Sequence, residues 1–137
     1  MVEIHQFVPN FYQGDAISGQ LLELDKIFHR LGFSGKIWTV SSDRFLKKLA
    51  RPYQQYSRFS RKDDLIFYHL SDPSPMTVFF HNLPGRKIII YHNVTPHHFF
   101  RESRLFYPTQ DPQEIQALAE VVEFAFGVSE FNRAELA

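Results

Sequence analysis

The sequence predicts an α/β fold in which an open, parallel β-sheet carries helices on both faces. One observation is that five short apolar runs alternate with segments of helical character, an alternation that favours a parallel sheet. The runs cover residues 4–8, 36–40, 65–68, 87–91 and 124–128. The other is that each run leads into polar residues or a histidine. Because the carboxyl ends of parallel strands lie along one edge, where open α/β folds bind their ligands, these polar residues are predicted to form one site.

The first third of the chain predicts a β-loop-α-β unit. Its expected elements are a strand over residues 2–8, a helix over residues 16–31 and a strand over residues 36–40. Gly14 lies in the first loop, where a glycine can adopt a positive φ or approach a ligand closely. Asp15 stands at the N-cap position, apolar residues then recur at helical spacing, and Gly32 ends the helix.

The later elements follow from apolar patterns and from helix start and stop signals. We expect strands over 63–68, 86–91 and 124–128. Helices are expected over 43–50, 74–82 and 111–123, and from residue 130. A loop over 53–62 and an irregular connection over 95–108 join these elements. Pro52 ends the first of these helices, and Pro112 suits the first position of the helix over 111–123. The last helix has no terminating glycine or proline, which indicates a fragment of a longer protein.

Composition limits the class of protein. The 137 residues fit one domain, 1–137, and the absence of cysteine excludes disulfides, thiolate metal sites and cysteine nucleophiles. A formal net charge of zero argues against nucleic-acid binding, so the 16% aromatic content is assigned to core packing, in runs such as 78–80 and 124–126. No apolar stretch approaches the roughly 20 residues of a membrane span, and the start does not read as a signal peptide. We therefore expect a cytoplasmic protein.

Basic residues concentrate in the stretch 44–62 and acidic residues near the end of the chain. We favour a solvated helix face and loop as the explanation of the basic stretch. The alternative is peripheral contact with anionic lipid headgroups at the inner membrane surface, or with a phosphorylated acceptor.

The turn with Gly14 and Asp15 lies between a strand and a helix N-terminus, where main-chain N–H groups and the helix dipole favour a phosphate or sugar. It is neither a GxGxxG fingerprint nor a Walker loop, and a plain tight turn is the alternative. His92 and Asn93 follow the strand over 86–91, and His69 occupies the equivalent point after the neighbouring strand. A histidine there can hydrogen-bond a sugar hydroxyl or transfer a proton. The alternative is a structural histidine.

The turn after the last strand carries Ser129 and Asn132, which suit helix capping and a second role toward a ligand in the same crevice. A metal is not expected, because His97 and His98 are adjacent and neither a cysteine nor a close carboxylate joins them. No Ser-His-Asp order or GxSxG elbow is present, so acyl transfer has no support.

Taken together, several segments resemble the N-terminal half of family-4 glycosyltransferases, which are retaining enzymes of the GT-B fold. The resemblance spans nearly the whole chain, in order and spacing. Its segments are residues 4–9 with 14–17, 68–71, 84–87 with 91–96, and 129–133 with 135–136.

The resemblance implies a two-domain enzyme that transfers a sugar from a nucleotide-sugar donor to a glycan, lipid or small-molecule acceptor, without a metal or other cofactor. Gly14 corresponds to the loop glycine that approaches the donor phosphates, and His92 to the strand-end histidine near the transferred sugar. His92 is therefore the catalytic candidate, and Ser129 begins a turn near the same cleft. The remaining substrate-binding candidates, taken by position, are Asp15, His69, Asn93 and Asn132.

The paired glutamates of the family's donor domain have no counterpart here. The resemblance therefore implies the acceptor-side half of the enzyme, inactive alone, whose partner is its own C-terminal donor domain. Two alternatives stay open: a stand-alone Rossmann-like module that binds a nucleotide or a protein without catalysis, and, with little support, a hydrolase that uses His92.

Overall fold

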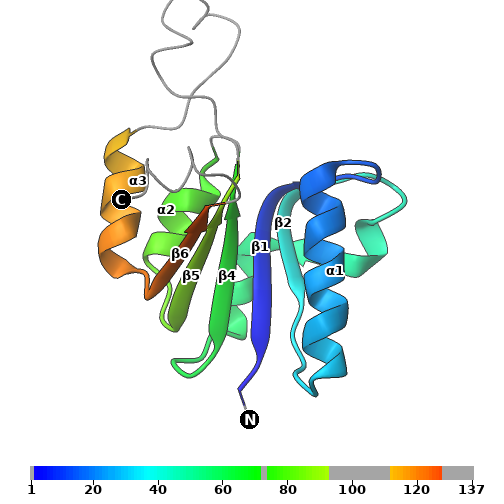
Figure 1. Cartoon of the computed structure of the whole chain (residues 1–137), viewed down its shortest axis with the longest axis horizontal. Helices are drawn as coiled ribbons and strands as arrows, with labels where there is room; N and C mark the ends of the chain where they lie inside the picture. The colour runs from blue at the N-terminus through cyan, green and yellow to red at the C-terminus, as the bar shows by residue number, and fades with distance from the viewer. Residues whose placement is uncertain (1, 72–73, 93–111, 128–137) are drawn as a thin grey trace, which may run out of the picture.

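The computed structural model of the chain describes residues 2–71, 74–92 and 112–127. Six parallel strands form one sheet in the order β3-β2-β1-β4-β5-β6 (Figure 1). The strands are β1 (Ile4–Phe11), β2 (Ile37–Ser42), β3 (Ala50–Pro52), β4 (Leu65–Leu70), β5 (Arg86–Tyr91) and β6 (Phe124–Gly127). This is a Rossmann-like α/β arrangement, so the predicted fold class is confirmed.

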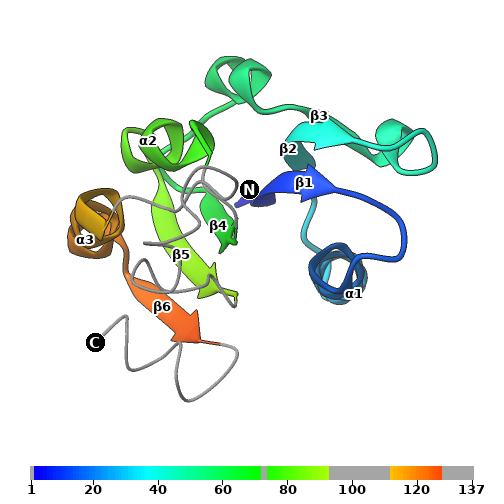
Figure 2. The ribbon, with the colours of Figure 1, turned by 90° about the horizontal axis from the view of Figure 1, so that it is seen from above.

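Helices cover both faces of the sheet. The helix α1 (Ala16–Arg30) lies on one face, and α2 (Met76–His81) and α3 (Pro112–Val121) lie on the other (Figure 2). Two short 3-10 helices, η1 (Lys47–Leu49) and η2 (Tyr53–Arg58), flank β3 along the chain. Among the described residues, none of the helices combines the length and the apolar character that a membrane span requires.

The caps of α1 match the sequence prediction. The Asp15 carboxylate accepts the Ser18 main-chain N–H at 3.0 Å, so Asp15 is the N-cap. The helix ends at Arg30, and Gly32 follows with a φ of 95°, a conformation that favours glycine after a helix. These two residues mark the ends of α1.

The short helix predicted over 43–50 is shorter than expected: only a 3-10 helix over Lys47–Leu49 forms, and Ala50 already belongs to β3. The Asp43 carboxylate accepts the main-chain N–H groups of Phe45 and Leu46, at 3.0 and 2.9 Å, which closes a turn rather than a helix. The chain then makes the single turn η1 and enters β3, which pairs with β2. A three-residue edge strand is too short to show an apolar period, and an edge is where a strand tolerates a proline such as Pro52.

The core lies on both sides of the sheet. The larger cluster, beneath α2, α3 and η2, is rich in aromatic residues, and Phe7, Trp38, Tyr56 and Phe80 are all fully buried there. Phe7 lies edge-on to Tyr56 and to Phe80, with ring centroids 5.1 and 5.7 Å apart, and such pairs stabilise the fold by about 0.5–1.5 kcal/mol each beyond the area they bury. Among the described residues, the buried aromatic side chains that serve core packing, as expected, are Phe7, Phe11, Trp38, Tyr53, Tyr56, Tyr68, Phe80 and Tyr91.

The run 124–126 is an exception to that expectation. Phe124 and Phe126 are 57% and 54% exposed, so the prediction that this run is buried is wrong. In the described part of the chain, β6 lies at an edge of the sheet, beside β5.

Candidate functional site

The carboxyl edge of the sheet has a topological switch point between β1 and β4. The chain leaves β1 toward β2 on one side, whereas β4 and β5 lie on the other side. Ligands of open α/β sheets bind in the crevice at such a point. The loop after β1 carries Gly14 and Asp15, β4 carries His69, and His92 directly follows β5.

His69 and His92 meet at this edge. The Nδ1 atom of His69 lies 3.0 Å from Nε2 of His92, and the two rings stack with centroids 5.3 Å apart. Both side chains are buried. The expectation that the two histidines occupy equivalent strand ends is wrong, because His69 lies inside β4 and pairs with Ile90, two residues before His92. The side chains of His69 and His92 are nevertheless in contact.

A buried glutamine that sequence reasoning missed completes this cluster. Gln6 of β1 is 1% exposed, and its Oε1 atom lies 2.8 Å from Nε2 of His69. Its Nε2 atom donates to the Leu21 main-chain oxygen of α1 at 3.1 Å. The available signal was a pair of polar residues, His5 and Gln6, inside the apolar run of a central strand, since buried polar side chains need hydrogen-bond partners.

Burial keeps both edge histidines neutral at pH 7. Desolvation, helped by the neighbouring His92, lowers the pKa of His69 to about 3. Desolvation also lowers the pKa of His92, although the negative charge of Asp15 opposes that effect. Asp15 therefore lies close enough to His92 to act on it electrostatically. The structure thus brings Asp15, His69 and His92 together at one edge.

The loop after β1 is held from two sides. Gln13 donates its main-chain N–H to the Asp43 carboxylate at 2.6 Å, and this hydrogen bond is the main cause that lowers the pKa of Asp43. Ser18 Oγ accepts the Tyr12 main-chain N–H at 3.0 Å. Between these anchors Gly14 has a φ of 87°, and a Cβ added there would meet no atom within 4 Å. The loop is thus fixed in place while the space beside Gly14 is open.

Three predicted site residues, Asn93, Ser129 and Asn132, lie outside the described residues. The adjacent pair His97 and His98 does so as well.

A second polar cluster lies at the opposite, amino edge of the sheet. Glu3, His5 and Asp64 place one ligand atom each within 4.8 Å of the others, and among the described residues this is a group that could hold a metal ion. The Nδ1 atom of His5 accepts the Lys36 main-chain N–H at 3.1 Å and the Trp38 indole N–H at 3.0 Å.

Those two N–H donors argue against a metal ion bound by His5. With Nδ1 accepting, the proton of a neutral His5 must lie on Nε2, the atom that faces the Asp64 and Glu3 carboxylates at 3.7 and 3.9 Å. Histidines that bind metals show the reverse arrangement, because the free nitrogen binds the metal while the other donates its proton. The cluster therefore fits a structural role and not a metal centre.

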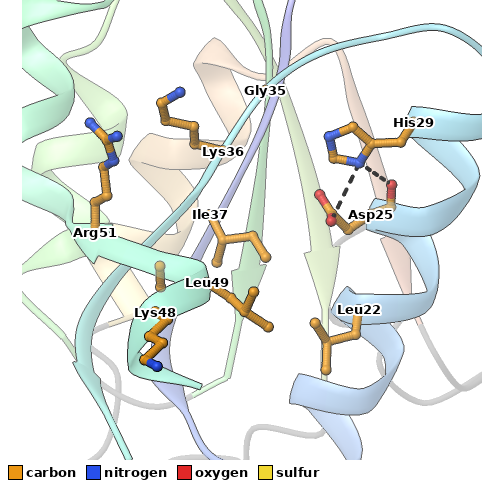
Figure 3. Close-up of a pocket in the computed structure, with 10 residues that line it drawn as sticks. Leu22, Asp25, His29, Gly35, Lys36, Ile37, Lys48, Leu49 and Arg51 are labelled. Carbon is orange, nitrogen blue, oxygen red and sulfur yellow. Dashed lines mark hydrogen bonds and ion pairs between the residues drawn. The ribbon is translucent and has the colours of Figure 1, made fainter. Parts of the chain in front are cut away.

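A cavity of about 310 Å³ also lies at the amino edge, between α1 and the starts of β2 and β3 (Figure 3). Lys36, Lys48 and Arg51 contribute to its lining. In Figure 3, the Lys48 amine lies at the opposite end of the view from the nitrogen atoms of Lys36 and Arg51. His29 and Asp25, which pair with each other on α1 at 3.4 Å, lie across the cavity from these two cations. Because the cations do not converge on one point, the carboxyl edge remains the stronger candidate site.

We predict that His69 makes the stability of the fold fall in mild acid. Its pKa is about 3 in the folded chain and about 6.5 when unfolded, so between these values the unfolded chain binds more protons. The free energy of unfolding is then highest above about pH 6.5 and falls as the pH drops toward 3. The decrease between pH 7 and pH 5 is about 2 kcal/mol. Urea unfolding at pH 7, 6 and 5 measures this loss.

The matched variant is His69→Gln, which keeps a hydrogen-bonding side chain but cannot titrate. Its stability should depend less steeply on pH than that of the native chain. A slope remains, because burial also lowers the pKa of His5 and of His92. An unchanged slope in this variant would show that His69 is not held neutral.

Comparison with known proteins gives no match to this chain among family models, curated proteins or solved structures. Its function therefore has to be inferred from its own residues.

Proposed function

We propose that this chain is the N-terminal, acceptor-side domain of a retaining family-4 glycosyltransferase of the GT-B fold. The observation that carries the proposal is the contact between His69 and His92 at the carboxyl edge of a parallel sheet, beside the N-terminus of α1. The order of the resembling segments along the sequence supports it. The domain would act together with a C-terminal donor domain that holds the nucleotide sugar.

The chemistry proposed for this edge has two parts. The N–H groups at the start of α1 and the open space beside Gly14 suit the diphosphate of the donor. His92, neutral at pH 7, suits a hydroxyl group of the transferred sugar. In a front-face substitution the bond from the anomeric carbon to the diphosphate breaks and a bond to the acceptor oxygen forms on the same face. The acceptor proton passes to the leaving diphosphate oxygen, while positive groups and helix N-termini stabilise the leaving diphosphate. Such a mechanism needs no nucleophile and no metal from this half.

The proposal is tested on the full-length protein that contains this chain. It is incubated with a panel of nucleotide sugars, and release of nucleoside diphosphate is measured. We expect release from at least one donor. Binding of a nucleotide without release from any donor would instead support the non-catalytic Rossmann-like module.

Gly14 offers a test with a built-in control. Gly14→Ala and Gly32→Ala both place a side chain at positive φ, 87° and 95°, and in neither case does the added Cβ meet an atom within 4 Å. Both should lose a similar amount of stability, about 1–3 kcal/mol. Only Gly14 lies at the carboxyl edge, so only Gly14→Ala should also raise the KM for the donor. An equal effect of both variants on KM would remove the Gly14 loop from the donor site.

We also propose peripheral membrane contact through the basic stretch 44–62. Its seven cations, Arg44, Lys47, Lys48, Arg51, Arg58, Arg61 and Lys62, are all exposed. Exposed apolar side chains lie among them, namely Phe45, Leu49 and Phe59, and Arg44 and Arg51 lie over the rings of Phe45 and Phe59. Cations next to exposed aromatic rings suit an anionic membrane surface.

Co-sedimentation with vesicles tests this contact. The chain should bind vesicles that contain phosphatidylglycerol and not vesicles of phosphatidylcholine alone. Replacing both Lys47 and Lys48 by Glu should weaken binding roughly tenfold or more, since each cation near the surface contributes about 1 kcal/mol. Arg30→Glu, an exposed charge change on α1, is the control and should have little effect. Equal loss in the control would argue against a defined membrane face.

A further inference from the structure

Four groups form one continuous line of hydrogen bonds from the interior to the carboxyl edge. In order they are the Leu21 main-chain oxygen, the Gln6 amide, the His69 ring and the His92 ring. The three side chains are at most 4% exposed. Water is therefore largely excluded as an alternative partner, and each hydrogen bond restricts the next.

The direction of the line is set at its inner end. A main-chain oxygen can only accept, so Gln6 must turn its NH₂ group toward Leu21. The Gln6 Oε1 atom then faces His69 as an acceptor, and Nε2 of His69 must carry the proton that it shares with Gln6. The reverse amide orientation would place two oxygens in contact.

The same logic continues to His92. Because burial keeps His69 neutral, its single proton is used toward Gln6, and its Nδ1 atom can only accept. His92 must therefore donate from Nε2. A neutral His92 then has its lone pair on Nδ1, an atom without a hydrogen-bond partner among the described residues.

We propose that Gln6 and His69 are positioning residues that hold His92 in its Nε2–H tautomer, so that Nδ1 faces the ligand as a hydrogen-bond acceptor. The group that His92 meets must then be a donor, such as a sugar hydroxyl, and not a phosphate oxygen. His92 could take up a proton on Nδ1 without breaking any of these hydrogen bonds. A second proton on His69 would lie on Nδ1 and face the Nε2–H of His92, so that hydrogen bond would be lost. Of the two histidines, only His92 is free to exchange a proton with a ligand.

The arrangement of protons does not depend on the proposed function, but its effect on catalysis does. The first experiment therefore measures tautomers directly, by nitrogen-15 NMR of the imidazole rings in the chain without a ligand at pH 7.5. We expect His92 in the Nε2–H form alone. Finding the Nδ1–H form would overturn the proposal.

Two variants test the line itself, with thermal unfolding as a check on folding. Gln6→Met removes the inner amide at similar length, so His69 loses its fixed proton and both histidines should become mixtures of tautomers. His69→Gln can still donate toward Gln6 and accept from His92, so His92 should keep its tautomer. A single, unchanged tautomer of His92 in Gln6→Met would overturn the proposal. This NMR measurement needs no enzyme assay.

The catalytic effect is measured in the full-length protein. His69→Leu should lower kcat by on the order of tenfold, with little change in the KM for the donor, whereas His69→Gln should largely restore kcat. Equal kcat for the Leu and Gln variants would show that His69 acts only through packing. If no donor is turned over but the tautomers are as expected, the proposed function fails and the line of hydrogen bonds stands.

Discussion

Gly35→Ala is expected to prevent folding of this chain. A Cβ at Gly35 would lie 1.6 Å from the Ile4 main-chain oxygen and 2.6 Å from its carbonyl carbon. Both are backbone atoms of β1, a central strand, and the segments are held together because Ile4 donates its main-chain N–H to Ser34 at 2.8 Å. Neither side can move without separating β1 from the chain that enters β2. The cost should exceed about 4 kcal/mol, which is close to the whole stability of a small domain.

Gly19→Ala is the matched control. Gly19 lies within α1, and a Cβ added there meets no atom within 4 Å. Because alanine favours a helix more than glycine, this variant should be as stable as the native chain or more so, by up to about 1 kcal/mol. Soluble yield and urea unfolding of both variants measure the contrast. Similar unfolding midpoints for Gly35→Ala and the native chain would show that Gly35 does not lie against the backbone of β1.

If the protein transfers a sugar as proposed, His92→Ala is expected to lower the kcat of that transfer by about 10²-fold or more. The variant removes the acceptor atom that we place toward the sugar, and it leaves the Nδ1 atom of His69 without its donor. The fold should persist, because His92 lies after β5 at an edge of the sheet rather than within the core clusters. Steady-state kinetics with the active donor, together with thermal unfolding, separates the two effects.

His29→Ala is the control for this variant. His29 is exposed on α1 and pairs with Asp25, away from the carboxyl edge. It should leave turnover unchanged. If His92→Ala turned over donor at the native rate, His92 would have no part in the reaction.

Local sequence patterns were sufficient for the parallel sheet and for α1. Apolar runs separated by helical segments can pack in few other ways, and Asp15 and Gly32 mark the helix ends by chemistry that depends on neighbouring residues alone. The proximity of His69 and His92 followed from the same reasoning, because parallel neighbours share one edge.

What the sequence could not reveal depends on register and on partners distant in the chain. The two-residue offset between His69 and His92 is set by the pairing of β4 with β5, which no local pattern encodes. Gln6 joins the site only because its neighbours across space are Leu21 and His69. Likewise, β3 is a strand because it pairs with β2. Its three residues are too few to show the alternation of apolar and polar residues that predicts a strand.

The central claim is that the carboxyl edge of the sheet, at the end of β1, β4 and β5, is the ligand site. Two-dimensional NMR of the isotope-labelled chain, titrated with nucleotide sugars at millimolar concentration, tests it most directly. We predict that the largest shifts fall on Gly14, Asp15, His69 and His92, with little change at Gly35, Lys48 and Arg51. Shifts confined to the cavity at the amino edge would contradict the claim.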